Sequence, residues 1–104
     1  MKEIEISALE DIPENKPWGF ERDGLALVLI RKGNEVFALE DVCSHMEVPL
    51  SFGTMVEEYV IQCLAHGARF DIRSGKNLSF PAVTPVRSYK TEVREGKVYV
   101  KIED

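Results

Sequence analysis

The chain has 104 residues, of which 44% are hydrophobic, and its formal net charge is −5. This length suits one domain with a single modest core, and the negative charge argues against a nucleic-acid partner. No apolar run approaches the roughly 20 residues of a membrane helix, and the charged N-terminal stretch MKEIEI differs from a signal peptide. We therefore expect a cytoplasmic protein that does not enter a membrane.

The apolar residues follow a period of two, which is typical of β-strands. Ile4 and Ile6 alternate with charged residues, and Asp23-Gly24, Gly33-Asn34 and Glu95-Gly96 predict turns. The prolines along the chain leave no room for a long helix. We expect an all-β fold, a small antiparallel sandwich or barrel. Its strands, in chain order, would be 4–6, 18–22, 25–31, 35–39 and 98–102.

Both cysteines and both histidines stand in two short pairs, Cys43-Ser44-His45 and Cys63-Leu64-Ala65-His66. Seventeen residues separate His45 from Cys63, enough for a hairpin that brings the two pairs face to face. Thiolate sulfur and imidazole nitrogen bind the same few metals, and a histidine at ligand spacing from each cysteine favours metal over a disulfide. The candidate metal ligands are therefore Cys43, His45, Cys63 and His66.

Two other interpretations of these four residues stay open at this point. They could be unrelated core residues, since free cysteine is often buried as a small hydrophobe. They could also form a structural zinc site, because two cysteines and two histidines make a good tetrahedral set. One residue separates Cys43 from His45, whereas paired zinc-finger ligands usually have about two to four between them. Spacing alone does not decide between the metals.

The wider pattern resembles the Rieske iron–sulfur fingerprint. The stretches that carry the likeness are Cys43-x-His45, Cys63-x-x-His66-Gly67, residues 38–41, Leu50-Ser51-x-Gly53, Arg69-Phe70-Asp71 with Gly75, and Phe80-Pro81-Ala82 with Pro85 and Tyr89. The resemblance implies an antiparallel β-sandwich or barrel with an inserted subdomain of two ligand loops. Residues 1–104 would form one Rieske domain, with a base of about 1–40 and 86–104 and a cluster-binding subdomain of about 41–85.

The same resemblance implies one [2Fe–2S] cluster in which two imidazoles replace two thiolates on one iron. Cys43 and Cys63 would hold the inner iron, and His45 and His66 the outer iron. The supporting residues would be Met46 and Leu64 as an apolar rim, Gly67 and Ala68 after the second pair, and Pro81 as a shield against water.

In length and organisation the chain is most similar to the small Rieske-type ferredoxins of bacterial multicomponent oxygenases. It would be an electron carrier rather than an enzyme, passing one electron from a flavin-dependent reductase to a terminal oxygenase. Docking would be transient, at the His45/His66 edge, with the carrier a monomer. Both histidines are committed, so none remains for the mononuclear iron of an oxygenase subunit. The alternatives are a small Rieske subunit of another assembly, such as a nitrite-reductase-like one, and a structural zinc-binding interaction module.

Four positions predict the potential of such a cluster. Val48 and Ala65 stand where high-potential Rieske proteins carry a disulfide, and Ala68 and Phe70 stand where those proteins have Ser and Tyr hydroxyls. Hydrogen bonds to cluster sulfur stabilise the reduced state, so their absence lowers the potential. We predict the low end of the Rieske range, near roughly −150 mV.

Overall fold

The computed structural model describes residues 2–42, 48–64, 67–79 and 84–102. Regular structure within these ranges is β-strand and short 3-10 helix, and none of the helices there is long and apolar enough to cross a membrane. The elements are β1 (Lys2–Ala8), η1 (Leu9–Asp11), β2 (Trp18–Arg22), β3 (Leu25–Lys32), β4 (Glu35–Glu40), η2 (Leu50–Phe52), β5 (Thr54–Glu57), β6 (Val60–Gln62), β7 (Arg69–Asp71), β8 (Ser88–Arg94) and β9 (Lys97–Ile102). The expected all-β class is confirmed.

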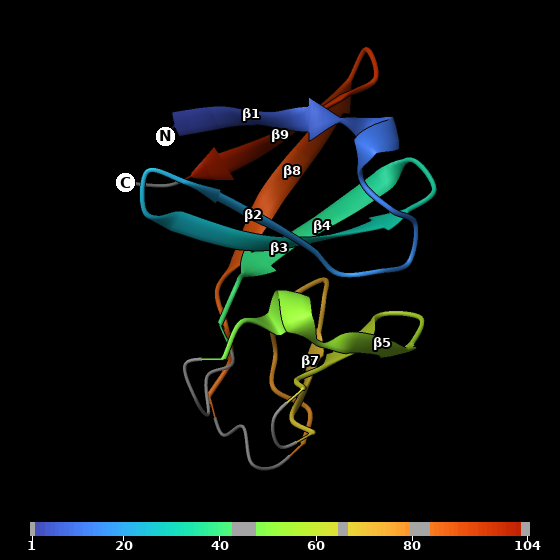
Figure 1. Cartoon of the computed structure of the whole chain (residues 1–104), viewed down its shortest axis with the longest axis vertical. Helices are drawn as coiled ribbons and strands as arrows, with labels where there is room; N and C mark the ends of the chain where they lie inside the picture. The colour runs from blue at the N-terminus through green and yellow to red at the C-terminus, as the bar shows by residue number, and fades with distance from the viewer. Residues whose placement is uncertain (1, 43–47, 65–66, 80–83, 103–104) are drawn as a thin grey trace.

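The strands form two antiparallel sheets, a larger one above a smaller one in Figure 1. The larger sheet has six strands in the order β1-β9-β8-β4-β3-β2. The predicted hairpin at Asp23-Gly24 joins β2 to β3, with Arg22 opposite Leu25. β8 pairs with β4 at Ala38–Tyr89 and at the neighbouring position, which connects the two halves of the sheet.

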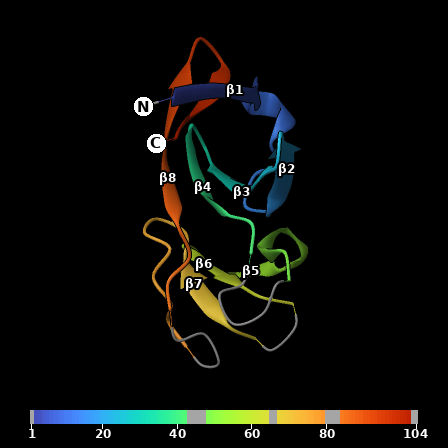
Figure 2. The same ribbon diagram turned by 90° about the vertical axis from the view of Figure 1, so that its left-hand side faces the viewer.

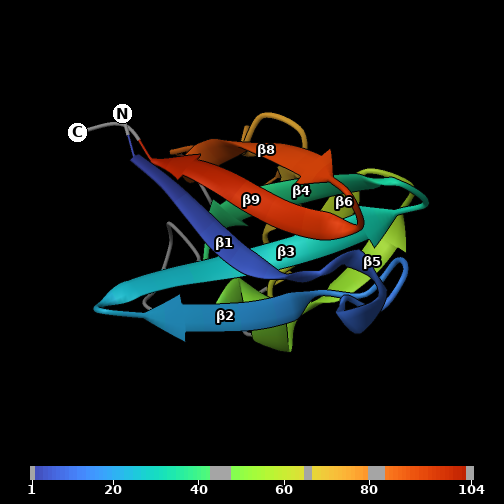
Figure 3. The same cartoon turned by 90° about the horizontal axis from the view of Figure 1, so that it is seen from above.

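The larger sheet curls on itself, as Figures 2 and 3 show from two sides. Its edge strands β1 and β2 are bridged by a hydrogen bond in which Arg22 Nη1 donates to the Glu5 carbonyl, 3.1 Å away. The curled sheet encloses an inner core. Its buried members are Ile6, Ile12, Leu27, Leu29, Val36, Ala38, Val98 and Val100.

Both faces of β3 are buried, which explains the unbroken apolar run LALVLI at 25–30. Successive side chains of a strand point to opposite faces. Leu27 and Leu29 therefore enter the inner core, whereas Val28 and Ile30 enter a second core on the outer face. A fully buried strand of this kind reads as a continuous apolar segment rather than an alternating one.

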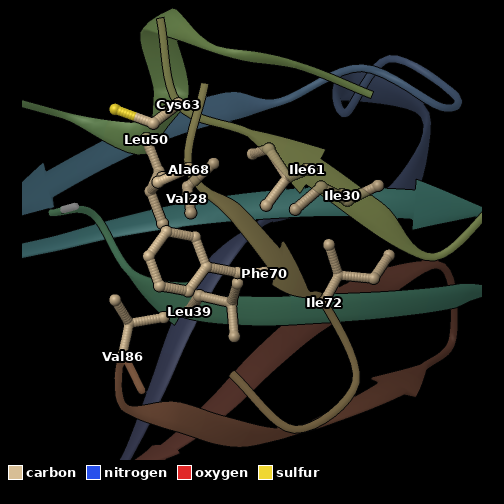
Figure 4. Close-up of a cluster of buried hydrophobic side chains, with 10 residues drawn as sticks. All are labelled: Val28, Ile30, Leu39, Leu50, Ile61, Cys63, Ala68, Phe70, Ile72 and Val86. Carbon is tan, nitrogen blue, oxygen red and sulfur yellow. The ribbon is translucent and has the colours of Figure 1, made fainter. Parts of the chain in front are cut away.

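The smaller sheet, β5-β6-β7, covers the outer face of β3 and β4 through the second core (Figure 4). The members of that core are Val28, Ile30, Leu39, Leu50, Ile61, Cys63, Ala68, Phe70, Ile72 and Val86. At one side Tyr59 packs edge-on against Phe37, with ring centroids 5.9 Å apart, and the Arg73 guanidinium lies 4.3 Å from the Tyr59 centroid. The smaller sheet thus depends on the larger one for its burial.

Candidate metal centre

The four candidate ligands lie on two segments that leave different parts of the fold. The first segment runs from the end of β4 to η2, and the second connects β6 to β7. Among the predicted site residues, those that lie outside the described ranges are Cys43, His45, Met46, His66 and Pro81. Those within them are Cys63, Leu64, Gly67 and Ala68. The part of the site that the structure describes therefore consists of Cys63 and of the residues at the ends of both segments.

Cys63 comes directly after β6, and 2% of it is exposed. It lies at the margin of the second core, next to Leu50 and Ala68 in Figure 4. Its backbone N–H donates to the Ala68 carbonyl at 2.7 Å, one step beyond the pairing of Gln62 with Arg69. The ladder of β6 and β7 thus continues to the base of the second ligand segment and fixes where Cys63 stands.

Gly67 has φ of +72°, in the left-handed region that strains residues with a side chain. A Cβ added there would meet the Gln62 side chain at 3.8 Å, which is ordinary van der Waals contact. The backbone angle, rather than crowding by described atoms, therefore calls for glycine at this position.

Leu64 and Ala68 occupy opposite environments. Leu64, next to Cys63, is 70% exposed, whereas Ala68 and Phe70 are fully buried in the second core. The exposed Leu64 side chain fits an apolar rim beside a ligand. Ala68 and Phe70 carry no hydroxyl, so neither side chain has a proton to donate to a sulfur nearby.

The stretch before Pro81 lies beside β7, a contact that the sequence does not predict. The Arg69 N–H donates to Ser79 Oγ at 3.1 Å, and the Leu78 N–H donates to the Arg69 carbonyl at 2.8 Å. Arg69 therefore ties the second ligand segment to the segment that leads into Pro81. The Asp71 N–H also donates to the Lys76 carbonyl, at 2.9 Å. Stretches this short show no period in the sequence, so only the structure reveals their pairing.

Charged groups around this end of the molecule are mostly exposed. Arg69 Nε donates to Gln62 Oε1 at 3.0 Å, and its guanidinium lies 3.9 Å from the Glu57 carboxylate. Hydrogen bonds from the Arg73 guanidinium hold the pKa of Asp71 below its ordinary value, partly offset by burial. Exposed pairs of this kind contribute little stability. Within the described ranges, which include only one of the four candidate ligands, no group of three or more metal-ligating side chains converges.

The comparison with protein families matches the Rieske [2Fe-2S] domain over residues 2–90. The chain belongs to the Rieske [2Fe–2S] family. The match runs from β1 through both ligand segments into the start of β8, so it includes the smaller sheet and all four candidate ligands. The resemblance inferred from the sequence is thereby confirmed, and so is the [2Fe–2S] cluster as the cofactor of this domain.

Individual Rieske relatives match the chain along nearly its whole length. It is 37% identical to the ferredoxin component of the p-cumate 2,3-dioxygenase system of Pseudomonas putida, over 95% of the chain and 85% of that protein. The ferredoxin of carbazole 1,9a-dioxygenase from Nocardioides aromaticivorans IC177 superposes with a TM-score of 0.92 at 31% identity, covering 99% of this chain and 100% of that one. A complex of reduced oxygenase and oxidised ferredoxin in carbazole 1,9a-dioxygenase contains a chain with a TM-score of 0.87 at 33% identity, covering 97% of each.

The residues present fit a Rieske cluster. The chain holds two cysteines and two histidines, the donor set that such a cluster takes. Cys63 is buried, and neutral imidazole ligands make the oxidised cluster core neutral, which lowers the cost of placing it beside apolar side chains. When bound, the cluster takes up and releases one electron.

Proposed function

We propose that this Rieske protein is the ferredoxin component of a multicomponent oxygenase. It receives one electron from a reductase, for which we propose a flavin enzyme, and passes it to a terminal oxygenase. It is an electron-transfer protein and not itself an enzyme. We place it in the cytoplasm, where such redox partners work, and expect a monomer that docks transiently.

The observation that carries this proposal is the end-to-end match with stand-alone ferredoxins. The alignment with the carbazole dioxygenase ferredoxin covers 99% of this chain and 100% of that one, so the two folds correspond along their length. The complex of an oxygenase with a similar ferredoxin shows the kind of acceptor that such a carrier meets. Leu64, exposed next to Cys63, supports docking at the end of the molecule that carries the ligand segments.

We assign Cys43 and Cys63 to the inner iron and His45 and His66 to the outer iron. The burial of Cys63 supports its place on the inner iron. We also propose that residues 1–40 and 86–104 form the base and 41–85 the cluster-binding subdomain. The position of β5, β6 and β7 in a sheet of their own supports this division.

The first test is EPR of the anaerobically purified, dithionite-reduced protein, with iron and acid-labile sulfide measured on the same sample. We expect iron and sulfide in equal amounts and a rhombic signal whose average g lies below that of four-cysteine ferredoxins. Reduction by a flavin reductase and reoxidation by a terminal oxygenase then test the carrier role. Stoichiometric zinc without sulfide would contradict the proposal and leave a zinc-stabilised binding module.

A further inference from the structure

Asp41 and Ser51 stand at the two ends of the first ligand segment and bind each other through both carboxylate oxygens. The Ser51 N–H donates to Asp41 Oδ1 at 2.6 Å, and the Ser51 hydroxyl donates to Asp41 Oδ2 at 2.7 Å. Hydrogen bonds to an ionised acceptor are shorter and stronger than neutral ones. Two bonds from one residue also fix the orientation of the carboxylate. The segment between them carries Cys43 and His45.

Both partners are anchored to the rest of the fold. The Asp41 N–H donates to the Ala26 carbonyl of β3 at 3.1 Å. Ser51 lies in η2, whose Leu50 is fully buried in the second core. Gly19 of β2 lies against the pair, because a Cβ added there would stand 3.1 Å from Ser51 Oγ and 3.7 Å from Asp41 Oδ2. The contact thus joins three fixed elements.

The same contact leads to the second ligand segment. Gly53, two residues after Ser51, packs so closely that an added Cβ would stand 2.1 Å from the Gln62 carbonyl oxygen. The next residue, Thr54, pairs with Gln62 across β5 and β6. Gln62 directly precedes Cys63. Short, stiff contacts therefore connect Asp41 to the backbone that holds Cys63.

We propose that Asp41 is a positioning residue for the cluster. Its carboxylate closes the first ligand segment onto η2 and so sets the ends of that segment relative to Cys63. The inference rests on the proposed function, since it requires a cluster held by both segments. It adds a specific dependence: the first segment is closed by a side chain, whereas the second is closed by the backbone bond from Cys63 to Ala68.

The variants Asp41→Asn and Asp41→Ala separate geometry from charge. Asn keeps a carbonyl oxygen for the Ser51 N–H, and its amide can donate to the Ser51 hydroxyl. Ala removes both contacts. Ser51→Ala removes the hydroxyl contact and leaves the backbone donor in place. If position is what matters, Asp41→Ala has the largest effect, Ser51→Ala a smaller one and Asp41→Asn little.

The experiment follows loss of visible absorbance from cluster-loaded proteins mixed with an iron chelator. Removing the groups that orient metal ligands typically weakens metal binding by about 10-fold or more. We expect Asp41→Ala to lose its cluster about 10-fold faster than wild type and to show altered EPR g values. Hydrogen exchange at the Ser51 amide, read by mass spectrometry, should accelerate in the same variant.

The controls are Asp71→Ala and Ser74→Ala, each of which removes a side-chain-to-backbone contact. Asp71→Ala also removes the ion pair with the Arg73 guanidinium, as Asp41→Ala also removes a second contact. Asp71 Oδ1 accepts the Arg73 N–H at 2.8 Å, and Ser74 Oγ accepts the Lys76 N–H at 3.2 Å. Both should lose the cluster at the wild-type rate. If Asp41→Ala does not fold, the contrast between Ser51→Ala and Asp41→Asn still decides.

Three results would overturn the inference while leaving the proposed function intact. These are a wild-type rate and EPR signal in Asp41→Ala, equal acceleration in Asp41→Asn and Asp41→Ala, and equal acceleration in Asp71→Ala. The second would assign the effect to charge, and the third to general destabilisation. A wild-type protein that holds no cluster would instead overturn the proposed function, and this inference with it.

Discussion

The two sheets differ in where their apolar residues find partners. All eight described residues of the inner core come from the chain up to Ala38 and from β9, so the larger sheet buries its own side chains. The second core includes Val28, Ile30 and Leu39, which lie on the outer face of the larger sheet. The smaller sheet has strands of three or four residues, too little to bury a core alone. The larger sheet therefore buries an inner core of its own, whereas the smaller sheet depends on the larger one for its burial.

Removal of a ligand gives the largest test of this asymmetry. In Cys63→Ala we expect iron and sulfide to fall to background, because the variant removes a ligand that we propose for the inner iron. Hydrogen exchange should rise across 54–71 and stay slow in β3 and β9, since the inner core contains no residue of the smaller sheet. Mass spectrometry of the exchanged peptides resolves the two regions. A uniform rise in both sheets would show that the base does not hold on its own.

Gly53→Ala should destabilise the smaller sheet, because the added Cβ would clash with backbone atoms. Its Cβ would stand 2.1 Å from the Gln62 carbonyl oxygen, a distance that requires the two strands to separate. We expect a loss of about 3 kcal/mol in the free energy of unfolding, as for severe overpacking.

The control is Gly24→Ala in the hairpin of the base, where nothing lies within 4 Å but φ is +83°. Left-handed strain alone costs about 1–2 kcal/mol. Urea titrations followed by circular dichroism give both values. A smaller loss in Gly53→Ala than in Gly24→Ala would mean that the close approach relaxes easily.

The same difference between the sheets explains why the strands of the larger sheet are easier to predict from the sequence than those of the smaller sheet. The strand expected at 25–31 is observed as Leu25–Lys32, and that at 35–39 as Glu35–Glu40, because these strands are long enough to show a pattern and end in recognisable turns. No strand was predicted at β5, β6 or β7. Three or four residues cannot display an alternation, and tertiary contacts set their pairing.

The candidate site likewise has one part that the sequence predicts and another that only the structure shows. The sequence predicts four candidate ligands because cysteine and histidine at short spacing carry a chemical signature. The contact between Asp41 and Ser51 was not predicted, since ten positions separate the two residues and both types are common. The sequence motifs contained both residues without showing that they meet. Candidate metal ligands can thus be predicted from the sequence, whereas the contacts that support them are seen only in the structure.

The redox potential tests the surroundings that we predict for the cluster, next to Ala68 and Phe70. Ala68 and Phe70 are buried without hydroxyls, so we predict a midpoint near roughly −150 mV. His66→Cys should lower it further where the cluster survives, because a thiolate in place of a neutral imidazole on the outer iron adds negative charge. An EPR-monitored redox titration measures both. A wild-type midpoint well above zero would mean that other donors stabilise the reduced cluster.

The smallest expected effect concerns acid stability at the turn after β7. The Arg73 guanidinium lowers the pKa of Asp71, so the folded protein holds this proton less tightly than the unfolded chain does. The pair therefore stabilises the fold above the unfolded pKa of about 3.9, and this contribution is lost as the pH falls through the lower, folded value. Arg73 is 55% exposed, so solvent screens the pair and the contribution is small.

In Asp71→Asn we expect the urea midpoint to fall less steeply than in wild type as the pH is lowered from about 4. Glu92→Gln, which removes the partner of Arg94 and Lys101 in the larger sheet, is the matched control. Hydrogen exchange should become faster at β7 in Asp71→Asn and at β8 and β9 in Glu92→Gln. Equal pH dependence in Asp71→Asn and wild type would show that the carboxylate titrates alike in the folded and unfolded chains.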